Sequence, residues 1–517
     1  MNFTDRTKST IKNVKTGLIN KTIMLIFPFI IRTILIKKLG ADYLGLSSLF
    51  TSILQVLNLT ELGFSNAIVY SMYKPLAEND VKKVSALMNF NKKVYRIMGL
   101  LIATIGLCLL PFIKNFISGS IPNDINVYIL YVIYLTNTVL TYFLFAYKSA
   151  LLTANQRNDI LNNISSLVNV IQFVAQIIVL ITLKNYYIYI ILTIFTTILN
   201  NLLVSHIFNK KYSNYNCSGN ICKNEKKELK KNVYGLMIQK LCQTSRNSLD
   251  SIFISMFLGL TTVAIYNNYY YIMNAVTGIL TIIISNMVAS IGNSVATEKI
   301  QKNYNDMNKF NFIYMWISGW CTISLLCLFQ PFMNIWMGNE YMFPFSVVIC
   351  LCLYFYQLKV NDIISIYKQA AGTWYSGRFE MILETLVNLI LNIILGKLYG
   401  VYGIILSTFI SLLLVGLPYG TYIIFKYYFK NMSMKKYHLR HIVYFIVTII
   451  IAAITYFITS FIIIGGIPEL LFKGIICLIV PNILYYIIYV KTPMFKESKD
   501  LINKILKLLK LKKTKIV

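Results

Sequence analysis

The sequence is poor in charge and in the residue types that most often build enzyme sites. Only 13% of its 517 residues are charged, and it contains 19 acidic residues and three histidines. A soluble chain of this length would form two or more domains with charged surfaces, which this composition does not provide. The alternation of apolar and polar residues that marks a transmembrane β-barrel is also missing. These absences argue against a soluble enzyme and against a barrel.

Metal-binding and disulfide patterns are missing as well. The nine cysteines fall mostly within apolar segments, and Cys217 and Cys222 share a polar loop without the spacing of zinc ligands. The histidines lie at the ends of predicted helices, where anchoring is the simplest interpretation. We therefore predict reduced, structural cysteines, no metal site, no cofactor and no enzymatic activity.

What the chain does contain is apolar sequence in long runs. Hydrophobic residues make up 57% of it, in runs of about 20, the length a helix needs to cross a hydrocarbon core of ~30 Å. We predict an all-α polytopic membrane protein with about fourteen transmembrane helices. The predicted spans are residues 22–38, 43–70, 94–113, 125–147, 160–183, 186–208, 233–258, 262–291, 310–329, 344–366, 380–396, 400–425, 441–464 and 470–490.

The formal net charge of +30 is concentrated between these runs, which argues against a nucleic-acid partner. Most Lys and Arg residues fall in alternate loops, and such loops face the cytoplasm in membrane proteins. The opposite loops hold few cations: Lys37, Lys38, Lys114, Lys184, Lys397 and Lys473. Both termini are therefore predicted to be cytoplasmic. The C-terminal tail alternates apolar positions with Lys504, Lys507 and Lys510, a pattern typical of a helix lying on anionic membrane lipids.

Short motifs recur at a nearly constant offset of about 220 residues, which indicates an internal duplication. The matched pairs are Leu39-Gly40 with Leu258-Gly259, Lys148-Ser-Ala150 with Lys368-Gln-Ala370, Arg157 with Arg378, and Leu167-Val-Asn169 with Leu386-Val-Asn388. We predict a six-helix lobe over 1–208, a basic cytoplasmic linker over 209–232, a second six-helix lobe over 233–430, two extra helices over 431–490 and a basic amphipathic tail over 491–517. Parallel repeats of this kind place the substrate of an alternating-access carrier at their interface.

Polar and ionisable residues inside the spans mark the candidate site, because such groups usually face a cavity or a partner. The predicted substrate-binding residues are Arg32, Lys240, Arg246, Lys359, Asn247, Asn267, Tyr271, Asn274 and Asn137. The acids that could couple transport to an ion are Glu61, Asp250 and Asp362. Structural explanations stay open for several of them. Arg246 and Asp250 could pair to join helices, Lys240 could reach the headgroups, and Asp362 could neutralise Lys359.

The chemistry of these residues favours an anionic substrate that carries carbohydrate. Amides and aromatic faces suit sugar hydroxyls and rings, whereas Arg and Lys suit phosphate. An exporter of cationic drugs would be expected to place carboxylates in its cavity instead. A membrane polymerase or glycosyltransferase is a weaker alternative, because the longest predicted outer loops have only about ten to fourteen residues and contain Asp124 and Glu340 as their only acids.

The segment Leu39-Gly-Ala-Asp-Tyr-Leu-Gly-Leu46, with Leu59-Thr-Glu-Leu-Gly-Phe-Ser-Asn-Ala67 and Tyr73-Lys-Pro-Leu-Ala-Glu78, resembles the N-terminal region of Wzx-type polysaccharide flippases. These export O-antigen, capsule or exopolysaccharide units and share a superfamily with MATE drug exporters and the lipid II flippase MurJ. The resemblance implies a MATE-like fold of fourteen helices in a bacterial plasma membrane. It also implies an undecaprenyl-pyrophosphate-linked oligosaccharide as substrate, and a polymerase and other polysaccharide-assembly proteins as partners. The alternative is a MATE-like, cation-coupled exporter of small molecules.

The resemblance further implies cationic residues in a central cavity. Arg32, Lys240, Arg246 and Lys359 are the positions of this sequence that could serve there. The identity of the sugar, the coupling ion and the oligomeric state are not readable from the sequence.

Overall fold

A computed structural model describes residues 3–58, 64–222, 241–246, 248–373 and 376–500. Within these ranges the chain forms helices joined by short turns, and no strand occurs. Among the described residues, ten helices are long and apolar enough to cross a membrane, or eleven if the bent pair Val127–Phe143 and Ala146–Ala154 is one span. The prediction of an all-α polytopic membrane protein is confirmed.

The predicted count of fourteen spans is compatible with these helices. The longest apolar stretch, Arg378–Tyr427, has 50 residues and contains the non-helical Gly400 (φ 61°), where two predicted spans meet. The shorter apolar helix Ala41–Leu57 covers only the first part of the second predicted span, 43–70, and a separate helix, Phe64–Ala77, begins before that span ends. The seventh predicted span, 233–258, lies partly outside the described residues.

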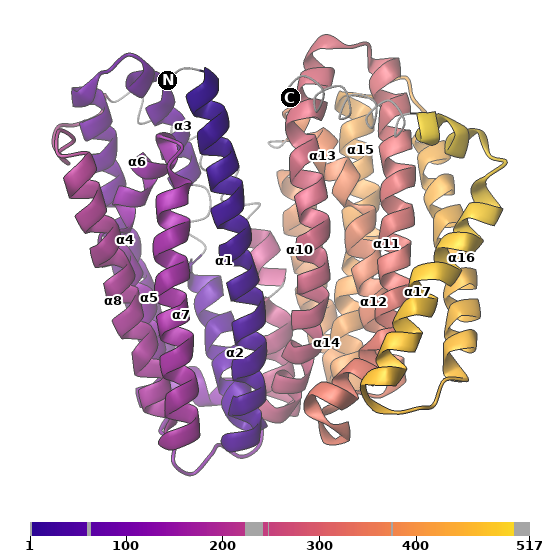
Figure 1. Cartoon of the computed structure of the whole chain (residues 1–517), viewed down its shortest axis with the longest axis horizontal. Helices are drawn as coiled ribbons and strands as arrows, with labels where there is room; N and C mark the ends of the chain where they lie inside the picture. The colour runs from indigo at the N-terminus through magenta and orange to yellow at the C-terminus, as the bar shows by residue number, and fades with distance from the viewer. Residues whose placement is uncertain (1–2, 59–63, 223–240, 247, 374–375, 501–517) are drawn as a thin grey trace. The chain divides into compact units, whose positions relative to one another are not determined.

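The chain divides into two compact units, Met1–Asn267 and Asn268–Val517 (Figure 1). Each unit is described by itself. In unit 1 the elements are α1 (Phe3–Lys38), α2 (Ala41–Leu57), α3 (Phe64–Ala77), α4 (Val81–Leu109), η2 (Leu110–Phe116), α5 (Val127–Phe143), η3 (Ala146–Lys148), α6 (Ser149–Ala154), α7 (Asn158–Thr182) and α8 (Tyr186–Lys211). Helical residues 241–246 and 248–258 and the first turns of α10 (Leu260–Thr297) complete it.

Unit 2 contains the rest of α10, followed by α11 (Ile300–Met337), η4 (Asn339–Tyr341), α12 (Phe345–Val360), α13 (Asp362–Ala370), α14 (Arg378–Ser411), the π-helical turn η5 (Leu412–Gly416), α15 (Leu417–Tyr427), α16 (Met434–Ser460) and α17 (Gly466–Tyr489). The last two helices pack on α11. Trp316 Nε1 donates to Asn482 Oδ1 at 2.9 Å, and Thr448 and Tyr485 share a hydrogen bond of 2.7 Å.

Side-chain chemistry at the helix ends explains several boundaries. Asp80 caps α4 by accepting from Lys83 N at 2.9 Å, and Asn126 caps α5 by accepting from Tyr128 N at 3.1 Å. These side chains satisfy backbone N–H groups that have no partner within the helix. Gly40, with φ at 118°, makes the turn between α1 and α2, a conformation that L side chains rarely adopt.

The motifs that repeat in the sequence lie at matching points of the two element series. Gly40 and Gly259 both have positive φ, and each makes the turn between two helices. Lys148 follows α5 in η3, and Lys368 follows α12 in α13. The lobes predicted over 1–208 and 233–430 are based on this shared order of elements, and their boundaries stay predictions. Part of the predicted linker over 209–232 and most of the tail over 491–517 lie outside the described residues.

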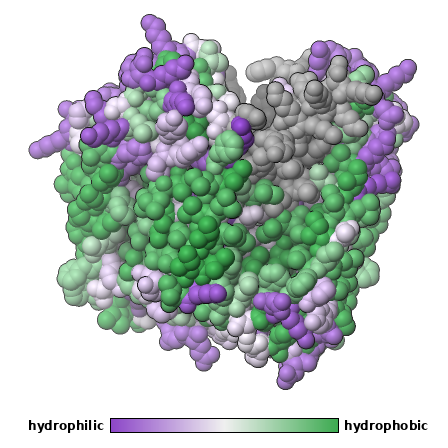
Figure 2. All heavy atoms as spheres, turned by 180° about the vertical axis from the view of Figure 1, so that it is seen from behind, coloured by the Kyte–Doolittle hydropathy of each residue, from purple (hydrophilic) through white to green (hydrophobic). Residues whose placement is uncertain are grey.

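The hydropathy of the surface follows the membrane prediction. In Figure 2, hydrophobic side chains cover the middle of each unit, and hydrophilic ones gather toward its two ends. Large apolar side chains such as Leu100, Phe195 and Ile487 are exposed along these helices. A soluble protein would bury such residues, whereas a lipid bilayer solvates them. All nine cysteines are free in this structure.

Candidate functional site

Two polar regions of unit 1 and one of unit 2 contain most of the described candidate residues. Glu61, Lys240 and Asn247 lie outside the residues whose side chains the structure describes, so their predicted roles stay predictions. Tyr271 is half-buried on α10, and Asn274 is exposed three residues later. The remaining candidates are placed as follows.

Arg32 contacts the beginning of α10. Its Nη1 donates to the backbone oxygen of Asn267 at 3.2 Å, and Asn267 Nδ2 donates to Ser251 Oγ at 3.2 Å. Asp250, only 1% exposed, accepts from the Tyr266 hydroxyl at 3.3 Å. We name these five residues the Arg32 cluster. The structure thus brings together Arg32, Asp250 and Asn267, which the sequence had placed in three different spans.

Arg246 is half-buried and lies four residues before Asp250 on the same stretch of chain. The sequence left open whether this spacing serves a structural ion pair or a cavity. Its role in substrate binding therefore stays a prediction, which the Discussion makes testable.

Asn137 borders a second polar region, which we name the amide pocket. It is a cavity of about 410 Å³ between α5, η3, α6, α7 and α8. Its lining residues are Thr141, Ala146, Ser149, Leu161, Ser165, Val168, Asn169, Gln172, Thr196, Thr197, Asn200, Asn201 and Val204. No described residue of this lining is ionisable. Asn137 accepts a hydrogen bond from the Thr197 hydroxyl at 2.8 Å, so it supports the wall from behind.

The amide pocket lies against α1, the helix that contains Arg32. Asn169 Nδ2 approaches Met24 Sδ at 3.2 Å. Met24 is eight residues before Arg32, which corresponds to about 12 Å along an α-helix. A neutral polar pocket and a guanidinium are therefore arranged along one helix of unit 1.

In unit 2, Lys359 forms an ion pair with Asp362. The ammonium lies 2.9 Å from Asp362 Oδ2, and the Tyr314 hydroxyl donates to the same oxygen at 2.5 Å. The Lys359 side chain is 4% exposed. Of the alternatives the sequence left open, neutralisation of Lys359 by Asp362 is the one seen in this structure.

Two buried lysines were assigned to cytoplasmic loops by the sequence. The Lys148 residue is 8% exposed, and its Nζ donates to Ser205 Oγ at 2.7 Å and to Asn209 Oδ1 at 2.8 Å. Lys368 Nζ instead donates to both carboxylate oxygens of Glu380, at 2.8 and 2.7 Å. The repeat had paired the two lysines. The sequence did not predict that either lysine is buried, because each lies close to a junction between two helices, where the periodicity of a single helix gives no information on burial.

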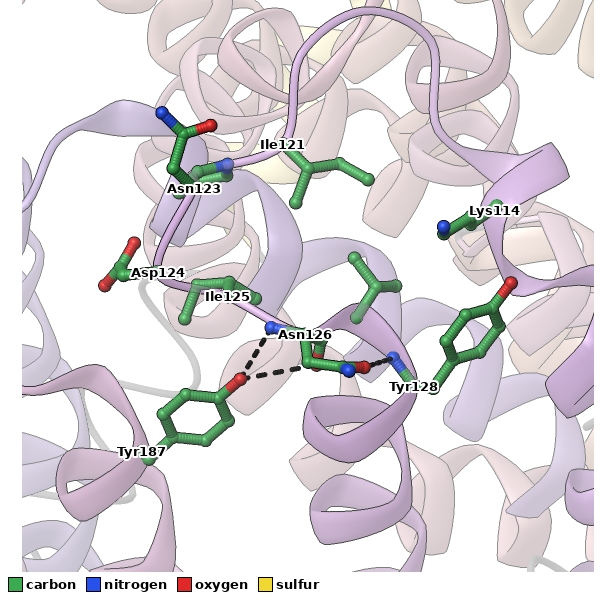
Figure 3. A pocket seen from close by; sticks show the side chains of 10 residues that line it. Lys114, Ile121, Asn123, Asp124, Ile125, Asn126, Tyr128 and Tyr187 are labelled. Atoms are coloured by element: carbon green, nitrogen blue, oxygen red, sulfur yellow. Dashed lines mark hydrogen bonds between the residues drawn. The ribbon is translucent and has the colours of Figure 1, made fainter.

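A further depression of unit 1 is lined by Lys114, by the segment before α5 and by Tyr187 at the start of α8 (Figure 3). It measures about 530 Å³. Asn126 N donates to the Tyr187 hydroxyl at 2.6 Å, and Lys114 Nζ lies 5.2 Å from the centre of the Tyr128 ring. These contacts anchor the beginning of α5. Lys114 and Asp124 are exposed, and the Asp124 carboxylate accepts a hydrogen bond from the Tyr43 hydroxyl.

Comparison with known proteins decides the family. A sequence profile described as polysaccharide biosynthesis protein matches residues 11–289, just over half of the chain. The chain belongs to this family. A search of curated protein sequences finds no match.

Solved structures of the same fold are membrane transporters. The lipid II flippase MurJ in an inward closed conformation aligns with a TM-score of 0.69 and 16% identity, over 93% of this chain and 99% of that one. An inward-facing MATE multidrug transporter aligns with a TM-score of 0.61 and 12% identity, over 80% and 99%. A MOP superfamily transporter from Pyrococcus furiosus aligns with a TM-score of 0.53 and 12% identity, over 80% and 94%. At these identities the likeness establishes the fold.

Together these findings confirm the Wzx-type, MATE- and MurJ-like resemblance. The protein is a multi-pass membrane protein of the polysaccharide biosynthesis protein family, and it has the fold of the MurJ and MATE transporters.

Proposed function

We propose that the protein moves an undecaprenyl-pyrophosphate-linked oligosaccharide repeat unit across the bacterial plasma membrane for cell-surface polysaccharide synthesis. The observation that carries this proposal is the amide pocket, a neutral hydrogen-bonding cavity within membrane-spanning helices. Amides and hydroxyls match sugar hydroxyls, and each polar group buried there needs a partner. Family membership agrees with a polysaccharide precursor as cargo.

The charged part of the substrate requires a different environment from the sugar. A pyrophosphate is best held by a guanidinium, which donates two parallel hydrogen bonds to phosphate oxygens. Arg32 supplies such a group along α1 from the amide pocket, and Arg246 and Lys240 are further candidates. In this proposal the lipid carrier stays in the bilayer, the pyrophosphate binds the cations, and the sugar enters the pocket. Alternating access between two six-helix lobes moves the headgroup from the cytoplasmic to the outer leaflet.

A MATE-like small-molecule exporter is the second candidate, and one observation favours it. Asp250 is a buried carboxylate in the Arg32 cluster, and a carboxylate within the membrane is the feature expected of a site for cations or for a coupling ion. That carboxylate accepts a hydrogen bond from the Tyr266 hydroxyl, and the backbone oxygen of the next residue along the chain, Asn267, accepts from the Arg32 guanidinium. The amide pocket contains no described acid.

Reconstitution in liposomes separates the two functions. The purified full-length protein is supplied with labelled undecaprenyl-pyrophosphate-linked oligosaccharide, and the fraction accessible to an external glycosidase is followed over time. A parallel set of liposomes is loaded with a cationic dye. We expect glycan exposure to be faster than in protein-free liposomes and dye efflux to be unchanged. Dye efflux without glycan exposure would establish the exporter and refute the flippase.

A further inference from the structure

Several hydroxyl oxygens in the walls of the amide pocket can act only as acceptors toward a ligand. A hydroxyl group has one proton, and several wall hydroxyls donate theirs to protein oxygens. Thr141 Oγ1 donates to Thr138 O at 2.7 Å, Ser149 Oγ to Ala146 O at 2.6 Å, and Thr197 Oγ1 to Asn137 Oδ1 at 2.8 Å. The oxygens of these groups can then only accept a hydrogen bond from a ligand.

Two further wall residues extend this pattern. The Thr196 hydroxyl has three acceptors within reach, Gln172 Oε1 at 2.8 Å, Leu192 O at 3.0 Å and Thr193 O at 3.1 Å, and the shortest of these is Gln172. With Oε1 turned to Thr196, the amide N–H groups of Gln172 are donors on the same wall. Asn200 Oδ1 is buried, and among the described residues no donor reaches it. A buried carbonyl oxygen that has lost water without gaining a donor is unfavourable, so this atom marks a position that a ligand donor would occupy.

Charge completes the description of the ligand. A ligand carboxylate in this pocket would face acceptor oxygens, and the described lining offers no cation to neutralise it. A quaternary ammonium would have no carboxylate of the described lining to pair with, and it has no N–H group to donate to the acceptor oxygens. A neutral sugar ring carries hydroxyls that donate to the threonine, serine and asparagine oxygens and accept from amide N–H groups. The volume of about 410 Å³ is within the ~300–1,000 Å³ usual for small-ligand pockets.

We infer that the amide pocket of unit 1 binds a neutral, hydroxyl-rich sugar residue of the transported oligosaccharide, and that Asn200 and Gln172 select it. This inference rests on the proposed flippase function. It adds that a repeat unit with a uronate or other acidic sugar at this position is rejected. The negative charge of the substrate is confined to its pyrophosphate, which binds elsewhere.

The test compares two synthetic undecaprenyl-pyrophosphate-linked repeat units in liposomes, identical except that one hexose is replaced by a hexuronate. We expect the wild-type protein to move the neutral unit at least about tenfold faster, because an unpaired charge must be desolvated in the pocket. Asn200→Leu and Gln172→Met remove hydrogen-bonding groups at similar volume and should slow the neutral unit by about two- to tenfold each. Equal transport of both units by the wild type would overturn the inference while leaving the flippase function intact.

Thr193→Val is the matched control. Thr193 is half-buried on α8, donates to Ile190 O at 2.6 Å, and does not line the pocket. This variant should transport both units like the wild type. If Thr193→Val slowed transport as much as Asn200→Leu, the effect would belong to α8 as a whole and the inference would fall.

If the protein transports neither lipid-linked unit, the proposed function is refuted. A separate binding measurement then still tests whether the pocket binds a neutral sugar. The thermal unfolding of purified protein is measured with maltotriose, chitotriose, their uronate-containing counterparts, and NaCl against choline chloride. Stabilisation by a neutral saccharide that is lost in Asn200→Leu supports the inference. Stabilisation by acidic saccharides, by Na⁺ alone, or by none of these probes overturns it.

Discussion

Lys368 and Glu380 form a buried two-point ion pair in unit 2, in which the ammonium donates to both carboxylate oxygens and each side chain is 6% exposed. The corresponding lysine of unit 1, Lys148, is buried beside the neutral acceptors Ser205 and Asn209. Each half of the chain thus buries a lysine after its fourth predicted span, and the two lysines are satisfied by different chemistry.

This difference predicts unequal costs of mutation. Lys368→Met leaves the Glu380 carboxylate buried without a cation and should lower the free energy of unfolding by about 3–5 kcal/mol. Lys148→Met leaves two neutral acceptors and should cost about 1–3 kcal/mol. Thermal unfolding of the detergent-purified variants measures both. The double variant Lys368→Met with Glu380→Leu should recover most of the loss, and failure to recover would show that the pair is not the cause.

Arg32 and Arg246 should be required for transport in the proposed mechanism. Losing a charge-assisted hydrogen-bond partner of the pyrophosphate should slow transport by about tenfold or more in Arg32→Ala and Arg246→Ala. Lys substitutions keep the charge but lose the fork geometry, so they should cost less. The measurement is restoration of surface polysaccharide in a flippase-deleted strain, with membrane levels of each variant quantified. Arg96, an exposed arginine on α4, provides the control variant Arg96→Ala. Normal transport by both alanine variants at normal levels would disprove the cationic site.

Gly45 allows close approach of α2 to the start of α10. A Cβ at this position would collide with the carbonyl group of Leu260, and the neighbouring Thr261 hydroxyl donates to Asp42. Gly45→Ala should therefore destabilise the protein by about 1–3 kcal/mol and reduce transport. Gly292, where a Cβ would meet open space, provides the matched control. Equal melting temperatures of Gly45→Ala and Gly292→Ala would contradict the close contact.

The Lys359–Asp362 pair offers a test of ion coupling. Asp362→Asn removes the acid that could exchange a proton or sodium ion, and it also leaves Lys359 without the carboxylate seen in the structure. The double variant Lys359→Met with Asp362→Asn removes the second effect. If Asp362 couples transport, the double variant should fold but lose its response to imposed proton or sodium gradients in liposomes. An unchanged response assigns Asp362 a structural role, and Asp250→Asn then becomes the next variant to test.

Labelling of two cysteines after α8 can show on which side of the membrane this loop lies. Burial raises the pKa of the Cys217 thiol, so less thiolate is present at neutral pH, whereas Cys222 is exposed. In intact cells a membrane-impermeant maleimide should label neither residue, because both are proposed to be cytoplasmic. After permeabilisation Cys222 should react faster than Cys217, as read by mass spectrometry. Labelling of Cys222 in intact cells would reverse the proposed topology.

The long apolar runs were sufficient to predict an all-α polytopic membrane protein. A bilayer requires about 20 apolar residues per helix, so the spans are local features that a linear sequence records directly. Most long helices of the structure overlap the predicted spans, whereas the predicted span 43–70 overlaps two helices, α2 and α3. Gly40 and Gly259, which the repeat had paired, both make turns with positive φ. The resemblance in residues 39–78 led to the family that the profile match then established.

The candidate site depended on tertiary structure. Ionisable residues in spans are conspicuous, so Arg32, Asp250 and Lys359 were found from the sequence. The environments of these residues could not be predicted from the sequence, because helical periodicity shows which face of a helix is polar but not which other helix that face contacts. Gln172 and Thr196 are 24 residues apart and become partners only because α7 and α8 pack together. Asn200, in a span rich in Asn and Thr, has no distinguishing sequence signal. Only the packing of the elements around the amide pocket leaves its carbonyl oxygen buried, with no donor among the described residues, and makes it a candidate contact for a sugar.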